Sequence, residues 1–160
     1  MNFSDTLLDV FDWLELTVVG AAIRDSIWLF PAIEAVHLLA LAVMGGAVLM
    51  VDLRLLGFGL NSRTVTEVAQ DAKPWFQRAL MLMFATGIPL FLSEAVKCFY
   101  NFSFWVKMSA LLVAILFTYL VRARVVSAEV PVGITQKTTG LVSMALWFCV
   151  AAAGRWIGFS

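Results

Sequence analysis

The sequence contains a single histidine, and this residue lies in a long apolar stretch with an acidic residue one helical turn before it. His37 follows Glu34 in the stretch 28–56. Two cations, Lys107 and Arg155, occur near the ends of two other apolar stretches. An imidazole can ligate haem iron, and nearby cations can neutralise the haem propionates. These residue types predict a site for one haem b with His37 as its axial ligand.

The positions of these side chains place them at similar depths if the apolar stretches cross a membrane. At about 1.5 Å per residue, His37 lies roughly 10 Å below the surface and Lys107 and Arg155 roughly 6 Å below it. Gly87 and residues 151–154 lie at the depth of the imidazole and are small. Small residues allow close helix packing or leave room for a flat ligand. We therefore expect the three charged or ligating side chains to converge on one cavity.

A second axial ligand cannot be another histidine of the same chain, because the chain has only one. Met108 is nearest in depth, and without it the iron is five-coordinate. Trp147 is interpreted as a packing residue or as a contact to the haem edge. The alternative for His37 is a hydrogen bond to a neighbouring helix with no ligand. One histidine and scattered carboxylates disfavour a metal other than haem.

A second group of charged residues lies where the first apolar stretch ends. Asp52 and Arg54 occur there, and Arg78 and Arg122 lie near the same side on the next two stretches. A buried carboxylate without a partner is costly. Asp52 is therefore predicted to pair with Arg122 or Arg78. We interpret the pair as a structural contact that fixes the helix ends, with a proton or ion route as the alternative.

The composition predicts an integral membrane protein. Of 160 residues, 62% are hydrophobic and 14% charged, and the formal net charge is zero. Soluble domains are about 45–50% apolar and about 25% charged. The balance leaves no basic surface for nucleic acid, and no hydrolase or nucleotide-binding motif occurs. Since a span needs about 20 apolar residues, we predict an all-α bundle of four transmembrane helices near 28–56, 75–96, 102–121 and 138–159.

The chain is divided into an N-terminal amphipathic segment, 1–27, and a transmembrane domain, 28–160. In the first segment one helical face is apolar and another is acidic, so we expect the helix to lie at the interface and dock against the bundle. The apolar face consists of Leu7, Phe11, Leu14 and Val18. The connection 57–74 is expected to contain a short helix, 64–72, capped by Ser62 or Thr64.

Two other local patterns concern helix geometry. Gly45 and Gly46 predict close packing between helices, and Pro89 predicts a kink in the second span. Cys98 and Cys149 are interpreted as small apolar core residues rather than a disulfide.

The distribution of Lys and Arg predicts the orientation. Seven of them lie on one side of the membrane and four on the other, where the acidic N-terminus also lies. The positive-inside rule then places both termini outside the cytoplasm. The seven are Arg54, Arg63, Lys73, Arg78, Arg122, Arg124 and Lys137, and the four are Arg24, Lys97, Lys107 and Arg155.

Several runs resemble a family of small bacterial four-helix inner-membrane proteins of unknown function. They are HLLALAVMGGAVLMVDLRLLG, TGIPLF, FWVK and GRWIGF, within residues 28–159. The family is distantly similar to the membrane domains of copper-resistance D proteins and to small b-type cytochromes. The resemblance implies a four-helix fold and directs attention to His37, Asp52, Arg54, Lys107 and Arg155. The cytochromes use paired histidines, and this chain departs from that pattern.

Three functions remain open. The first is a single-haem protein for electron transfer or for binding or sensing a diatomic gas. The second is a non-catalytic accessory or scaffold subunit of a membrane complex. The third is a small proton or metal-ion transporter lined by Glu34, His37, Glu94 and Lys107, although only one of its spans is broken. In each case the partners are the lipid bilayer and a second copy or another subunit.

Overall fold

The computed structural model describes residues 3–59, 62–128 and 132–159, and these parts contain helices and no strand. Four segments are long and apolar enough to cross a membrane, which confirms the prediction of an all-α bundle. They are α3 (Leu29–Leu56), α4 (Val65–Ser93), the continuous segment of α6 (Phe102–Phe117), η1 (Thr118–Arg122) and α7 (Ala123–Ser127), and α8 (Ile134–Ile157). The shorter helices are α1 (Phe3–Glu15), α2 (Val18–Arg24) and α5 (Ala95–Tyr100).

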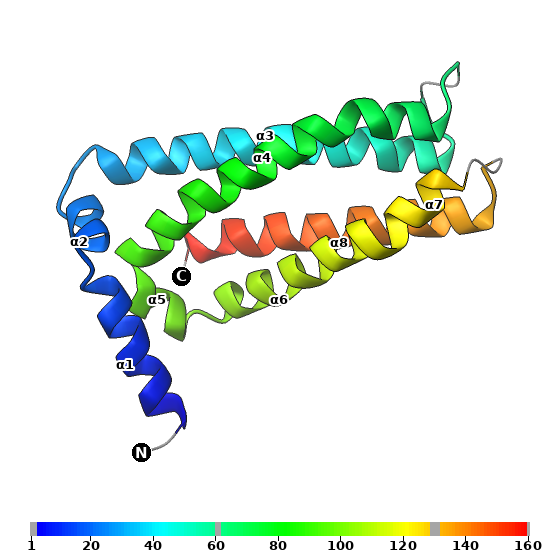
Figure 1. Ribbon diagram of the computed structural model, residues 1–160. Helices are drawn as coiled ribbons and strands as arrows, with labels where there is room; N and C mark the ends of the chain where they lie inside the picture. Colours follow the sequence, from blue (N-terminus) through cyan, green and yellow to red (C-terminus); the bar gives the residue numbers. More distant parts are fainter. Residues whose placement is uncertain (1–2, 60–61, 129–131, 160) are drawn as a thin grey trace.

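Helix α3 packs against α4 and α8, and α6 packs against α8. The second and third spans meet through α4 and α7 and through the stacked rings of Phe91 and Phe104. Both chain ends, together with α1, α2 and α5, lie at one end of the bundle, which we call the terminal end (Figure 1). The α3–α4 and α7–α8 connections lie at the other end, which we call the connection end (Figure 1). The protein is thus a multi-pass membrane protein with both termini on one side.

The core is tight at the connection end and loosens toward the terminal end. On α3, Met44, Val48 and Leu55 are buried on one face. The helical repeat brings His37 onto the same face, yet its side chain is only half-buried. The helices therefore leave the imidazole partly uncovered at the terminal end. The buried cluster consists of Met44, Ala47, Val48, Val51, Leu55, Val68, Ala72, Phe76, Ala79, Ala114, Trp147 and Val150.

The second span begins ten residues earlier than expected. The sequence suggested a separate short helix before Trp75, but α4 runs unbroken from Val65 through Pro74. Thr64 caps it with a full capping box, accepting a hydrogen bond from the Glu67 amide. Pro74 leaves the carbonyl of residue 70 without its helical donor. Gln70 is exposed, so this carbonyl lies where water at the interface can satisfy it.

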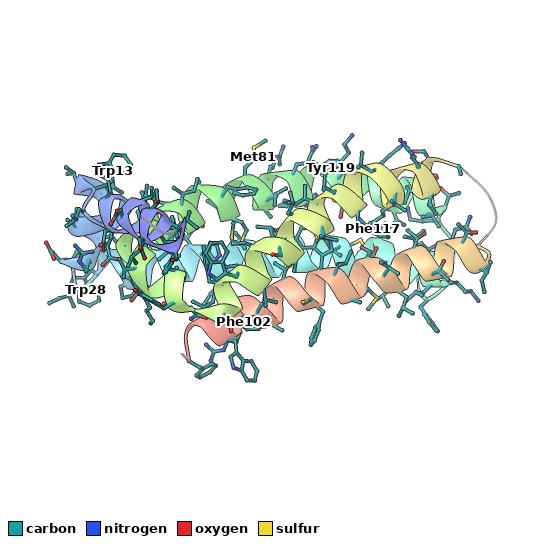
Figure 2. The ribbon with its side chains drawn as sticks, turned by 90° about the horizontal axis from the view of Figure 1, so that it is seen from below. Trp13, Trp28, Met81, Phe102, Phe117 and Tyr119 are labelled. Carbon is teal, nitrogen blue, oxygen red and sulfur yellow. The ribbon has the colours of Figure 1, made fainter. Side chains whose placement is uncertain are left out.

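The prediction of close helix packing at Gly45 and Gly46 is wrong within this chain. A Cβ at either position would meet no atom within 4 Å. Both glycines lie on the outer surface of α3, away from the face that packs against α4 and α8. The outer surface of the bundle is apolar in many places, and Met81 of α4, Phe102 of α6 and Tyr119 of η1 are exposed on it (Figure 2).

The N-terminal segment forms two helices that dock against the terminal end. Phe11 is buried and packs edge-on against Phe91 and Phe99. The apolar face expected on this helix does not extend to Val18. Helix α1 ends at Glu15, and Val18 begins α2 in an exposed position.

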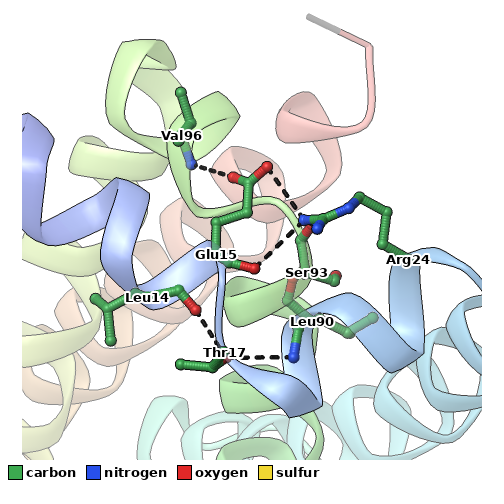
Figure 3. Close-up of polar contacts among 8 residues, drawn as sticks. Leu14, Glu15, Thr17, Arg24, Leu90, Ser93 and Val96 are labelled. Carbon is green, nitrogen blue, oxygen red and sulfur yellow. Dashed lines mark hydrogen bonds and ion pairs between the residues drawn. The ribbon is translucent and has the colours of Figure 1, made fainter.

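Glu15 fastens this segment to the bundle (Figure 3). One carboxylate oxygen accepts a hydrogen bond from the Val96 amide at 2.7 Å, and the other pairs with Arg24 at 3.2 Å. Arg24 also donates to the carbonyl of Ser93 at 3.4 Å. The carboxylate therefore joins α1, α2 and the start of α5.

Candidate functional site

The imidazole of His37 is held by a hydroxyl on the neighbouring helix. Nδ1 of His37 lies 2.8 Å from Oγ1 of Thr86. The hydroxyl donates its one hydrogen to the carbonyl of Leu82 at 2.7 Å. The oxygen must then accept from the ring, so Nδ1 carries the hydrogen. The backbone of Met83 is a further hydrogen-bond partner of the ring. In this tautomer the lone pair lies on Nε2.

The His37 side chain is half-buried, so part of the residue is uncovered. An imidazole whose second nitrogen is fixed by a hydrogen bond and whose first is open has the arrangement that metal-ligating histidines use.

Gly87 allows the ring to lie against α4. A Cβ at this position would stand 3.2 Å from Cε1 of His37 and 3.7 Å from Nδ1. The space beside Gly87, which the sequence suggested for a flat ligand, is therefore filled by the imidazole of His37. The space it provides seats His37 beside Thr86.

The side chain of Lys107 lies against Gly154, another of the small residues noted in the sequence. Its side chain crosses to α8, where a Cβ on Gly154 would lie 3.4 Å from Cε and 3.5 Å from Nζ. Lys107 is close enough to His37 for its charge to act on the imidazole. Among the residues that the structure describes, it has no ion pair and no hydrogen bond. An ionisable residue in a membrane span is a candidate for a functional role.

Three other candidates lie outside this pair. Arg155 is exposed, with its guanidinium over the ring of Phe159 at 4.4 Å. Met108 is exposed on α6. Trp147 is buried in the tight core, where Nε1 donates to Thr118 Oγ1 at 3.2 Å. Among the predicted site residues that the structure describes, Lys107 is the one whose charge acts on His37.

Two shallow grooves lie along α6 and α8. Their volumes are about 440 and 390 Å³, and their walls are largely apolar. Neither groove includes His37 or Lys107. They share the residues Phe102 and Val106.

Asp52 is buried at the connection end with a guanidinium from another helix. Two cations were predicted as its partner, and Arg122 forms the ion pair. Its Nε lies 2.8 Å from Oδ1 of Asp52. Arg122 also donates to the carbonyl of Val48 at 3.3 Å. Arg54 instead donates to the carbonyl of Arg63 at 2.8 Å, and Arg78 is exposed.

A local change of helix type positions this guanidinium. Residues 118–122 form one π-helical turn, η1, and both Thr118 and Arg122 in it are buried. A π turn adds a residue to the helix and rotates the side chains that follow. The turn lets Arg122 face α3 while Thr118 faces Trp147 on α8.

Sequence reasoning missed Thr86, Thr118 and Ser143. Thr86 had a usable signal, because it lies in an apolar span at nearly the depth of His37. Ser143 is wholly buried on α8, at 0% exposed, but a serine among apolar residues is common in membrane helices.

The described residues bring few metal-ligating side chains together. In the described ranges, no group of three or more His, Cys, Asp or Glu side chains could hold a metal ion. A single imidazole suffices only for a metal that brings its other ligands, as iron in a porphyrin does. The cation at Lys107 matches the carboxylates that such a group carries.

Among the comparisons with known proteins, the match to a family model assigns the chain to a family. Neither the curated proteins nor the solved structures include a chain that matches it. One family pattern covers the chain from the buried part of α1 to its last residue. By this match to residues 10–160, the chain belongs to the family of unknown function DUF6644.

Proposed function

We propose that the protein binds one haem b, with Nε2 of His37 as the axial ligand of the iron. The observation that carries the proposal is the contact of 2.8 Å between His37 and Thr86, which fixes the tautomer and leaves Nε2 open. The loose packing around this half-buried residue supports it, as does the lack of other ligating side chains nearby in the described part. The distant likeness to small b-type cytochromes belongs to the same proposal.

Lys107 is the residue that would pair with a propionate. Its charge acts on the imidazole of His37, and it forms no ion pair with a carboxylate of the described residues. Arg155 is near the same end and can serve a second propionate after leaving Phe159.

The bound group would supply a redox-active iron with one protein ligand. A five-coordinate iron leaves an open position for a diatomic gas, which favours binding or sensing. A ligand from a second copy or from another subunit would close that position and favour electron transfer. Met108 would have to turn inward from its exposed position to act as that ligand.

The test is an absorption spectrum of the purified protein after expression with a haem supply. We expect a Soret band in the wild type and its loss in His37→Ala. Lys107→Met should weaken haem binding by roughly 10–100-fold, since a charged hydrogen bond contributes about 1.5–3 kcal/mol. The matched control is Lys97→Met, because Lys97 is exposed and already pairs with Glu94 at 3.8 Å.

A folded wild-type protein that stays colourless after titration with haemin contradicts the proposal. A band that persists in His37→Ala does so as well. Either result would leave the accessory or scaffold subunit as the better proposal. The transporter is less supported, because Glu34 is exposed and Glu94 pairs with Lys97 instead of facing His37.

We further propose that the protein resides in a bacterial inner membrane with both termini outside the cytoplasm. The Lys and Arg count supports this orientation: seven such residues belong to the connection end and four to the terminal end. His37 and Lys107 would then lie in the outer half of the membrane.

A further inference from the structure

The two shallow grooves along α6 and α8 lie outside the proposed haem site. Their volumes are about 440 and 390 Å³, and their walls are largely apolar. Both are lined by Phe102, the first residue of α6, and by Val106 one turn further on. The first continues along α6 as far as Val113, and the second includes α8 as far back as Phe148. The grooves therefore adjoin at the terminal end of the bundle.

The length of these grooves corresponds to one leaflet of a membrane. At 1.5 Å per helical residue, the path from Phe102 to Val113 is about 16 Å long. A hydrocarbon core of about 30 Å gives each leaflet about 15 Å. Phe102, Val113 and Phe148 are all exposed, so the grooves are open on the outer surface of the bundle. An acyl chain that enters at the terminal end can therefore lie in either groove along its whole length.

Arg155 supplies a positive charge at the terminal end of the α8 groove. It follows Phe148 by seven residues and Ala152 by three, and this spacing places it on the same helical face as these two lining residues. Its guanidinium stacks on Phe159 at 4.4 Å, and a stacked guanidinium still has N–H groups free at its edge. Among the described residues, Arg155 forms no ion pair and no acidic side chain lines either groove. The charge is therefore available to an anion at the membrane surface.

We propose that one anionic phospholipid binds here, with one acyl chain in each groove and its phosphate on Arg155. The two grooves adjoin at Phe102 and Val106, as the two chains of a phospholipid join at one glycerol. A helix of a second copy fits less well, because a helix is about 10 Å wide and the Phe102 ring, 80% exposed, borders both grooves. Arg155 is then committed to the lipid, and Lys107 remains for a haem propionate.

The charge is tested by native mass spectrometry of the detergent-purified protein with added dioleoyl lipids. We expect one phosphatidylglycerol to bind roughly fivefold more tightly than phosphatidylcholine, which has the same chains but no net charge. Arg155→Gln should remove this preference. The matched control is Lys97→Gln, which should keep it, because Lys97 pairs with Glu94 and lines neither groove.

The grooves are tested by filling one of them. Ala152→Leu places a larger side chain in the α8 groove and should weaken the binding of both lipids roughly fivefold, since less of one chain is buried. Ala42→Leu is the control, because Ala42 is exposed on α3 and lines neither groove. It should leave both affinities unchanged.

Three results would overturn the proposal. They are equal affinities of the two lipids for the wild type, a preference that survives Arg155→Gln, and equal effects of Ala152→Leu and Ala42→Leu. A dimer that Ala152→Leu dissociates, with no lipid on the monomer, would assign the surface to a second copy instead. None of these measurements depends on haem, whose binding is followed separately by the Soret band.

Discussion

Thr86 and His37 form a contact in which the direction of the hydrogen bond is determined by a third group. The threonine oxygen lies 2.8 Å from Nδ1, and its own hydrogen is committed to the Leu82 carbonyl at 2.7 Å. The chain has one histidine, so the imidazole can be observed without interference from others. The tautomer of His37 is therefore directly measurable in the whole protein.

We expect ¹⁵N spectra of histidine-labelled protein to show the hydrogen on Nδ1. Thr86→Val should remove this preference and weaken any metal ligation at Nε2 by roughly 10–100-fold, the usual effect of losing such a supporting contact. Thr86→Ser, which keeps the oxygen, should restore both properties. Observation of the hydrogen on Nε2 in the wild type would contradict the geometry.

Gly87→Ala should displace the imidazole. The new Cβ would lie 3.2 Å from Cε1 of His37, closer than comfortable contact. We expect a changed ¹⁵N shift at His37 and weaker ligation, with a stability loss of about 1 kcal/mol. Gly46→Ala is the control, because a Cβ there meets nothing within 4 Å. Equal His37 spectra in both variants would argue against the contact.

Separating Asp52 from Arg122 should destabilise the fold strongly. Asp52→Ala or Arg122→Ala leaves one buried charge unpaired, which costs about 3–5 kcal/mol. The double replacement Asp52→Leu, Arg122→Met should recover most of this loss. Denaturation in mixed detergent measures these differences. Arg54→Ala, which removes an exposed bond to a backbone carbonyl, should cost less than about 1 kcal/mol.

The orientation can be tested with fused reporters. A reporter after Ser160 should be active only if it functions outside the cytoplasm, and one inserted at Gly59 should show the opposite behaviour. The reason is the excess of Lys and Arg at the connection end. Cytoplasmic activity of the C-terminal fusion would reverse the proposed sides, but the relative depths of His37 and Lys107 would stand.

Cys98 should react slowly with maleimides. Burial, followed by the nearby Glu94 carboxylate, raises the pKa of Cys98 to about 11. Alkylation requires the thiolate, which is depleted below that pH. In a Cys149→Ala background the rate at pH 7.5 should be roughly 100-fold below that of an ordinary thiol and should rise about tenfold per pH unit. Rapid labelling at pH 7.5 in the folded protein would be inconsistent with burial.

The sequence was informative where a residue's own chemistry limits its surroundings. Long apolar stretches require spans, and Thr64 followed by Glu67 marks a helix start. Asp52 inside an apolar run requires a cation, and depth narrowed the choice to two arginines.

The sequence did not predict which side chains meet between helices. These contacts depend on the rotation of each helix about its axis, which residue spacing alone does not determine. The π turn at residues 118–122 orients Arg122 toward α3, and its amino-acid sequence does not indicate a change of helix type. Gly87 and Gly154 were predicted to allow close helix packing or to leave room for a flat ligand. The sequence could not reveal that His37 and Lys107 themselves fill that room.

The attachment of Glu15 to Val96 also has a consequence for the order of events during synthesis. The two residues are 81 positions apart. At about 5–20 residues per second, the amide of Val96 leaves the ribosome roughly 4–16 s after the carboxylate that it will bind. Throughout that interval α1 has no docking site, since α5 and the end of α4 do not yet exist. The N-terminal segment can therefore make this contact only after the first two spans have been synthesised.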